Sequence, residues 1–453
     1  MTAEEKRQKI SELKKKIEET KAEYDRAKAM QLALKLVING TYGAFAHPKF
    51  VLSNSHIANA ITAMGRDVIQ YMLKKIEKYF YKEWHLDKDA HRLLGIEYIA
   101  EKEGKYFLLN SEGVNIHYPH NSVDDILNKL NISKSQLEED KKQLDDYNIL
   151  YVRNVHDFSD IRQIPKDEPI IIYGDTDSLY VSFSPVMKSC GFKGDELDFI
   201  LHLDRVIIKN IFNRYLDEYA ERFGVKNLHD FELETINRSA LHIQKKHYIN
   251  NVVYEDGIFY ENLSYFYPKG VEIVKSSTPP FVRENIYEFL KYIFSNPDNI
   301  NIRKVLTIVK ELKKQFIMAD IEAISMTSSC SNYQTKVIDD VTDVVTVKGA
   351  HFSIKAAALH NYLLNKNSEY KIKYDMIRGG RIKYYYCNHP KNNVFAYMRS
   401  FHPYEIIEKE GVKIDYDQQF DVTVLSIVNR FLEPIGLPTI NKRLSVLNSI
   451  FSV

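Results

Sequence analysis

The chain has 453 residues, of which 44% are hydrophobic and 27% are charged, and its 62 basic and 61 acidic side chains leave a formal net charge of +1. This composition is typical of a soluble globular protein with two or three domains, and net charge alone identifies no class of partner. Three distant cysteines argue against a zinc site or a disulfide framework, and without an apolar membrane span or a signal peptide we expect a cytoplasmic protein with no membrane contact.

The first predicted element is a helix over residues 2–38, which contain no proline or glycine and many strong helix formers. Apolar residues are sparse up to Tyr24 and dense from Met30 onward. We therefore expect the first part to project as a charged helix and the second part to enter a core. A lysine-rich helical face of this kind is more often simply solvated than functional.

A break at Gly43 and Pro48 separates this helix from a second one. Over residues 55–84 apolar side chains recur at helical spacing, which predicts a long buried helix. The pattern then loosens into short strands over residues 97–109 and a charged helix over residues 134–144. Nothing in these later segments indicates chemistry.

Residues 170–183 predict a β-hairpin, because the runs IIIY and LYVSF are rich in β-branched and aromatic residues. Gly174, Asp175 and Thr176 supply the turn between them. The tip of this hairpin therefore carries two carboxylates, Asp175 and Asp177.

The remaining elements follow in three groups. Residues 196–223 have the spacing of an amphipathic helix, and residues 231–266 alternate like the strands of a sheet. A proline-led start signal at residues 279–295 opens a region that we expect to be mostly helical.

The two acids of the hairpin admit two interpretations. Aspartate is common in turns because its side chain hydrogen-bonds nearby amides, and for an isolated D-x-D this explanation is the better one. Alternatively, the pair holds Mg²⁺, which prefers oxygen ligands and shares them with substrate phosphates. Two such ions activate an attacking hydroxyl and stabilise a leaving pyrophosphate.

A second candidate site lies in KLVINGTYG, residues 35–43. On a helix, Lys35, Asn39 and Tyr42 are four and three positions apart and share one face. A cation, an amide and an aromatic ring on one stripe suit a triphosphate, a base edge and a stacked ring. Taken alone, the stretch is better explained by a buried tyrosine with incidental polar neighbours.

Taken together, these stretches resemble the family B DNA polymerases, most closely those of tailed bacteriophages. KLVINGTYG is similar to the family's motif B (K-x-x-x-N-S-x-Y-G), and YGDTDS matches motif C in the same order along the chain. Residues 50–72 resemble the palm helix after motif B, QKKHYI the segment that touches the primer-template backbone, and KGVEIVKSSTPP the entry into the thumb. The resemblance covers nearly the whole chain except about residues 85–165.

The resemblance implies that Asp177 is the main ligand of two catalytic Mg²⁺ ions, with Asp175 as its companion and Glu234 as a further metal carboxylate. A solvent-facing strand glutamate is nearly as good an explanation of Glu234. His247 stands where the family has arginine, and Gly40 where it has serine. Two further groups are implied, residues that bind the incoming dNTP and residues that bind the primer-template: Lys35, Asn39, Tyr42 and Arg7 for the first, and Lys245, Lys246 and Tyr248 for the second.

The resemblance also implies an α+β fold with the right-hand architecture of polymerases, in which the fingers are helical, the palm is an antiparallel sheet and the thumb is mainly helical. In chain order, we expect the fingers with the motif B helix over 1–43, the palm helix over 44–84 and an insertion over 85–168. The palm with motif C follows over 169–280, and the thumb with a clamp-binding tail over 281–453.

One part of the family's active site has no counterpart in this sequence. Motif A, D-x-x-S-L-Y-P-S, precedes motif B in the family and supplies the other metal-binding aspartate, and the proofreading exonuclease lies further upstream. We therefore expect a split polymerase in the cytoplasm of a phage-infected bacterium. An N-terminal partner chain would supply motif A and the exonuclease.

The end of the chain, RLSVLNSIFSV, carries apolar anchors at Leu447, Ile450 and Phe451. In phage relatives this tail docks on the sliding clamp, although a terminal helix that packs on the thumb explains it equally well. Two other functions stay open. One is a non-catalytic DNA-binding or assembly subunit derived from a polymerase, and the other is a right-hand polymerase that uses or makes RNA.

Overall fold

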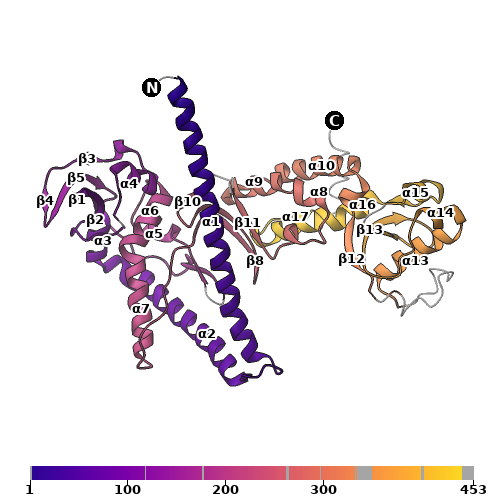
Figure 1. The fold of residues 1–453 in the computed structure, drawn as a ribbon, viewed down its shortest axis with the longest axis horizontal. Helices are drawn as coiled ribbons and strands as arrows, with labels where there is room; N and C mark the ends of the chain where they lie inside the picture. Colours follow the sequence, from indigo (N-terminus) through magenta and orange to yellow (C-terminus); the bar gives the residue numbers. More distant parts are fainter. Residues whose placement is uncertain are drawn as a thin grey trace. The chain divides into compact units, whose positions relative to one another are not determined.

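Figure 1 shows the computed structural model of the chain. The structure describes residues 3–117, 119–175, 178–261, 265–295, 297–331, 333, 349–398 and 402–440, without the side chains of residues 3–8, 10, 13, 17 and 298. The chain forms two compact units, Met1–Glu232 and Leu233–Val453, and each is described by itself. Helices and antiparallel sheets occur together, which confirms the predicted α+β class.

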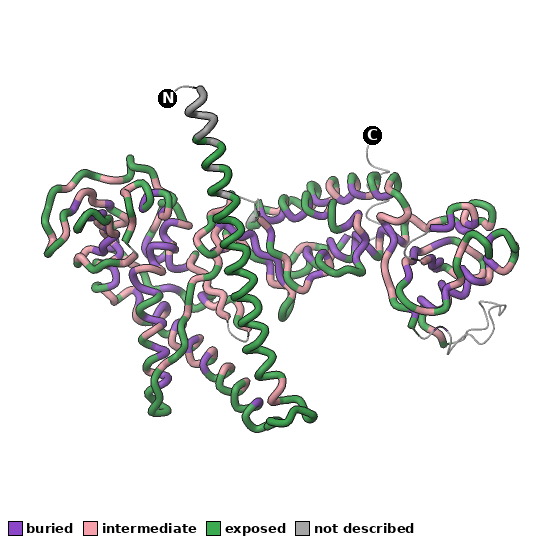
Figure 2. Tube along the Cα trace, viewed as in Figure 1, coloured by how far each residue is buried: buried purple, intermediate pink, exposed green. Residues whose placement is uncertain are grey.

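The first element is α1 (Ala3–Ala46), a single helix that continues through Gly43 and ends before Pro48. Glycine inside a helix costs about 1 kcal/mol relative to alanine, so it weakens the helix without ending it. Figure 2 shows α1 exposed along almost its whole length. The large apolar side chains of residues 30–38 are 58–69% exposed. The prediction that this part enters a core is therefore wrong for the described chain.

The second long helix is α2 (Ser55–Lys78). Its second half is buried through the side chains of Val68, Met72 and Ile76, whereas most side chains of its first half are exposed. The predicted long buried helix is confirmed for the second half only. Short helical elements of the same unit are a π-helical turn at Tyr79–Glu83, a 3-10 turn at Trp84–Leu86, α3 (Lys88–Gly95) and α5 (Ser184–Ser189).

Residues 96–154 form a five-stranded antiparallel sheet of order β2-β1-β5-β3, in which β4 also pairs with β5. The strands predicted over 97–109 are confirmed. The charged helix predicted over 134–144 is wrong, because its backbone pairs with β5 instead of with itself. The elements are β1 (Ile96–Lys102), β2 (Lys105–Asn110), α4 (Val123–Leu130), a 3-10 turn (Lys134–Gln136), β3 (Glu138–Glu139), β4 (Gln143–Leu144) and β5 (Tyr147–Asn154).

The helix predicted over 196–223 is confirmed as α6 (Glu196–Leu203), a π-helical turn (Asp204–Ile208) and α7 (Lys209–Glu221). It packs on α2 through polar as well as apolar contacts. The Tyr219 hydroxyl donates to Asp67 Oδ2 at 2.7 Å. Helices α2 and α7 thus pack together and share one core within the first unit.

A cluster of paired charges is buried where the five-stranded sheet meets α6. Glu97 Oε2 accepts from Arg153 Nη1 at 2.9 Å, and Glu97 Oε1 lies 2.5 Å from His202 Nδ1 and 3.0 Å from Arg205 Nη2. Arg153 also pairs with Asp198. Burial alone would raise the pKa of the Glu97 carboxyl, but the nearby cationic groups outweigh burial and hold that pKa well below its ordinary value.

In the second unit, β9 pairs with each of the other three strands of an antiparallel sheet. These strands confirm the alternation predicted over 231–266. Their bounds are β8 (Thr235–Gln244), β9 (His247–Glu255), β10 (Ile258–Phe259) and β11 (Phe266–Lys269).

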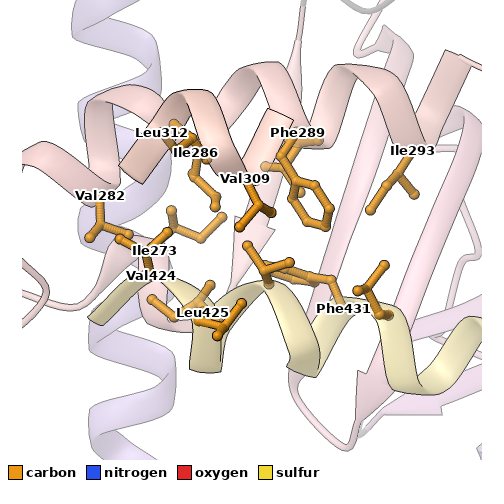
Figure 3. Close-up of a cluster of buried hydrophobic side chains, with 14 of the residues drawn as sticks. Ile273, Val282, Ile286, Phe289, Ile293, Val309, Leu312, Val424, Leu425 and Phe431 are labelled. Atoms are coloured by element: carbon orange, nitrogen blue, oxygen red, sulfur yellow. The ribbon is translucent and has the colours of Figure 1, made fainter. Parts of the chain in front are cut away.

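The largest core of this unit lies between helices and that sheet. Figure 3 shows Ile286, Phe289 and Val309 from one set of helices facing Leu425 and Phe431 from another segment. The surrounding helical elements are Glu272–Val274 (3-10), α8 (Pro280–Asn285), α9 (Tyr287–Ser295), Pro297–Asn299 (3-10), α10 (Ile302–Met318), α11 (Ile321–Ile324), α16 (Tyr416–Phe420), Asp421–Leu425 (π), α17 (Ser426–Leu432) and Glu433–Ile435 (3-10).

A second antiparallel sheet was not predicted in this mostly helical region. It pairs β12 with β13, and β13 with β14 and β15, and α13 packs against β14. In the described ranges no helix is long and apolar enough to cross a bilayer. The elements are β12 (Met326–Ser329), α13 (Phe352–Asn365), α14 (Ser368–Lys373), β13 (Arg381–Asn388), β14 (Val394–Met398), α15 (Tyr404–Lys409) and β15 (Lys413–Ile414).

The buried charge cluster makes a measurable prediction. Arg153→Met should lower the free energy of opening the five-stranded sheet by about 3–5 kcal/mol, because the buried Glu97 carboxylate loses a charge partner. Hydrogen exchange of the β1 and β5 amides measures that opening. The matched control is Arg92→Met, because Arg92 pairs with Glu112 at 2.6 Å but its side chain is 59% exposed. The control should cost no more than about 1 kcal/mol, and equal effects would contradict the assignment.

Candidate active site

The acidic hairpin is formed by β6 (Ile171–Asp175) and β7 (Ser178–Val181). Asp175 is paired with Ser178, whose Oγ donates to the Asp175 carbonyl at 3.2 Å. Gly174 and Asp175 therefore belong to the strand, whereas the sequence predicted them in the turn. The connection is residues 176–177, so Asp177 lies outside the described residues. Asp175 ends β6 with a half-buried side chain.

Helix α2 supports the hairpin from one side. Ile171, Leu179 and Val181 pack against the core that also holds the buried half of α2. A Cβ placed on Gly174 would lie 3.4 Å from Leu179 Cδ2 and 3.8 Å from Leu73 Cδ1, so α2 passes close to the strand at this residue. The position of the Asp175 backbone is therefore set by packing against α2.

The hairpin is a sheet of only two strands. An isolated two-stranded sheet is marginally stable in water, and further strands or a helix are needed to hold it. Here α2 supplies one such support. The ladder of this hairpin contains no third strand among the described residues.

The predicted nucleotide-binding residues lie on α1. The helix is continuous through them, so Lys35, Asn39 and Tyr42 share one face as their spacing predicts, and all three are exposed. Arg7 belongs to the same helix, but its side chain is outside the described set. The structure thus presents an open polar stripe without a covering element on the described part of the chain.

A short capped junction fixes α2 to the end of α1, and sequence reasoning missed it. The Asn54 amide donates to the Phe45 carbonyl at 2.9 Å, and Asn54 Oδ1 accepts from the amides of His56 and Ile57 at 3.0 and 3.2 Å. Asparagine before a run with helical periodicity is a standard N-cap signal and was the clue available in the sequence. Asn54 therefore links the end of α1, which carries the polar stripe, to the start of α2, which packs beneath the strand of Asp175.

The predicted DNA-binding residues belong to the second unit. Lys245 and Lys246 are exposed at the turn between β8 and β9. Tyr248 is only 2% exposed, and its ring centroid lies 5.1 Å from that of His242. Tyr248 therefore packs beneath this turn. Of the three predicted DNA-binding residues, the two lysines are the ones at the surface.

The other predicted site residues are placed as follows. Glu234 precedes β8, is exposed, and accepts from the Asp256 amide through its backbone carbonyl at 3.1 Å. The clamp-binding residues Leu447, Ile450 and Phe451 lie outside the described residues.

The described residues fit a magnesium site only in part. No group of three or more His, Cys, Asp or Glu side chains that could hold a metal occurs among them. Asp175 alone offers a hard carboxylate at the open end of a hairpin, a donor that suits Mg²⁺ when water and phosphates supply other ligands. A complete magnesium site at this hairpin would need oxygen ligands in addition to Asp175.

The chain matches the model of a known protein family. The family model described as DNA polymerase family B matches residues 4–435, a range that includes the polar stripe of α1 from Lys35 onward, the hairpin and most of both compact units. No curated protein matches the chain.

Proposed function

The chain belongs to the DNA polymerase family B, and we propose that it is the fingers, part of the palm and the thumb of a split, phage-type replicative polymerase. Membership of this family implies DNA synthesis from dNTPs on a primer-template with divalent metal ions. The observation that carries the finer proposal is the pairing of two features in one unit, the polar stripe of α1 and the acidic hairpin β6–β7. Both features occur in the family's order along the chain.

Each residue of these features has a role in the proposed reaction. The primer 3′-hydroxyl attacks the α-phosphorus of the dNTP, a new phosphodiester bond forms, and pyrophosphate leaves. Asp177 and Asp175 would hold two Mg²⁺ ions, which supply charge neutralisation at the reacting phosphates. Lys35 pairs with the triphosphate, and Asn39 and Tyr42 border the nascent base pair.

We propose that a second polypeptide completes the palm. Residues 30–38 of α1 expose apolar side chains on more than one side of the helix, beside the polar stripe that begins at Lys35, and a broad apolar face of a helix normally packs against another element. Among the described residues the hairpin pairs only two strands, and a sheet of that size is marginally stable without further support. A partner with the acidic strand of motif A and the exonuclease would satisfy both features.

A non-catalytic assembly subunit is the second candidate, because the same exposed apolar helix would serve assembly alone. The polar stripe favours catalysis, since assembly gives no reason for a cation, an amide and an aromatic ring on one face. The proposed clamp contact of Leu447, Ile450 and Phe451 is compatible with either candidate.

Reconstitution separates the two candidates. The isolated chain should show no Mg²⁺-dependent primer extension, and co-expression with the polypeptide that carries the missing acidic strand should restore it. Asp177→Ala should then lower extension at least 1,000-fold by loss of metal-dependent charge stabilisation, on the order of 4 kcal/mol. Asp89→Ala is the control, because that side chain is 88% exposed on α3. Extension by the isolated chain would overturn the split site, and an assembled complex without extension would favour the assembly subunit.

Lys35 can be tested separately from assembly. In the reconstituted enzyme Lys35→Ala should lower kcat/KM for the dNTP by about 10- to 100-fold, as expected for the loss of a charge-assisted contact of 1.5–3 kcal/mol. Arg26→Ala is the matched control, because nine residues along α1 turn its side chain to the opposite side of the helix. Single-nucleotide incorporation gives both values. Equal losses in the two variants would exclude a specific contact of Lys35.

The apolar part of α1 predicts the assembly contact. Leu34→Glu should weaken binding of the second polypeptide by at least 10-fold, because a carboxylate would be buried at the contact. The isolated chain should fold normally, since Leu34 is 58% exposed in it. Leu86→Glu is the control, as Leu86 is 67% exposed and lies outside α1. Co-purification and circular dichroism check the two parts, and unchanged binding of the Leu34 variant would rule out this face.

A further inference from the structure

The turn between β8 and β9 holds a lysine in an unfavourable backbone conformation. Gln244 and His247 are paired across it, which leaves Lys245 and Lys246 as the two turn residues. Lys246 has a φ of 62°, in the left-handed region. That region costs a residue with a Cβ roughly 1–2 kcal/mol, and glycine or asparagine normally occupies it. A lysine with this backbone conformation is therefore a candidate for a functional contact of its charged group.

The end of β11 presses against the same turn. Gly270 follows Lys269, the last residue of β11, and has a φ of 67°. A Cβ on Gly270 would lie 2.0 Å from the Lys246 carbonyl oxygen and 3.1 Å from the Lys246 carbonyl carbon. Both neighbours are backbone atoms, so no side-chain rotation would relieve the contact. Only glycine allows this approach, and the approach fixes where the Lys246 backbone lies.

Lys269 brings a third cation to this end of the sheet. It is exposed, it is paired in the ladder with Tyr248, and its Nζ lies 5.6 Å from the centroid of the Tyr248 ring. Tyr248 is itself buried and packs against His242, so it forms a fixed base under the lysine. The contact of an ammonium with an aromatic face favours this position of Lys269.

We propose that Lys269 joins Lys245 and Lys246 in one phosphate-binding element for the duplex backbone, and that Gly270 is the positioning residue that sets the strained turn. The inference rests on the proposed function, because it takes the ligand to be the product duplex of DNA synthesis. Three cations on two adjacent segments suit phosphates, which position a duplex without reading its sequence. Sequence patterns alone drew attention only to the first two lysines.

The salt dependence of duplex binding tests Lys269. For the full chain with a primer-template duplex, Lys269→Gln should reduce the slope of log K against log salt by about 0.9, the value of one lost phosphate contact. It should weaken binding equally for duplexes of different sequence. Lys291→Gln is the control, because that lysine of α9 pairs with Glu288 at 3.3 Å and lies away from the turn in sequence. Its slope should equal that of the parent chain.

A double-mutant cycle tests Gly270. Lys246→Asn removes the charge while asparagine still tolerates a positive φ, so the slope should fall by about 0.9 without loss of thermal stability. Gly270→Ala should weaken duplex binding about tenfold in the parent chain, because the turn must move. In the chain that already carries Lys245→Gln and Lys246→Asn, Gly270→Ala should change binding less than twofold. Thermal unfolding by circular dichroism confirms that each variant is folded.

The outcomes distinguish the inference from the proposed function. Salt-dependent duplex binding by the parent chain, with an unchanged slope in Lys269→Gln, would overturn the role of Lys269 and leave the polymerase intact. An equal effect of Gly270→Ala with and without the two turn lysines would show that the glycine acts on folding alone. A parent chain without any salt-dependent duplex binding would remove the proposed DNA contact, and the inference with it.

Discussion

The close packing of α2 beneath the β6–β7 hairpin is the constraint on which the candidate active site depends. Leu73 of α2 lies next to Gly174, and the apolar side of the hairpin shares a core with the buried half of α2. Asn54 caps the other end of α2 and holds it to the last turn of α1 through the Phe45 carbonyl. Helix α2 therefore packs against the acidic strand near one end and is joined at its other end to α1, which carries the polar stripe. A change in its buried half would alter the packing beneath the acidic strand.

The five-stranded sheet is attached to this support by charge as well as by apolar packing. Glu97 lies in β1, Arg153 in β5 and His202 in α6, so the buried cluster ties two strands to the helix that runs along α2. Buried charges are costly unless every one is paired, and mispairing of the two segments would leave at least one alone. The cluster thus favours a single arrangement of the five-stranded sheet on α6. This specificity explains why charged residues occur inside an otherwise apolar junction.

Local patterns in the sequence predicted the elements whose hydrogen bonds are local. The helices over 2–38 and 196–223 and the strands over 97–109 satisfy their backbone groups within themselves or with a near neighbour, and all three predictions are confirmed. Strand pairing in two other segments was not predictable from spacing. Residues 134–144 have a helical composition but pair with β5, and β12 pairs with a strand more than fifty residues away along the chain. In both segments tertiary pairing outweighs helix propensity.

Two features raise the free energy of the isolated chain: the backbone conformation of Lys246 and the exposed apolar side chains of residues 30–38. The free-energy cost of each indicates the kind of contact that would offset it. The left-handed backbone of Lys246 costs roughly 1–2 kcal/mol, which a few phosphate contacts would offset. Six exposed large apolar side chains over residues 30–38 correspond to about 1.5–3 kcal/mol each when buried, on the order of ten in total. These two departures from local folding rules are the basis of the two contacts that we propose, a modest one for duplex phosphates and a larger one for another polypeptide.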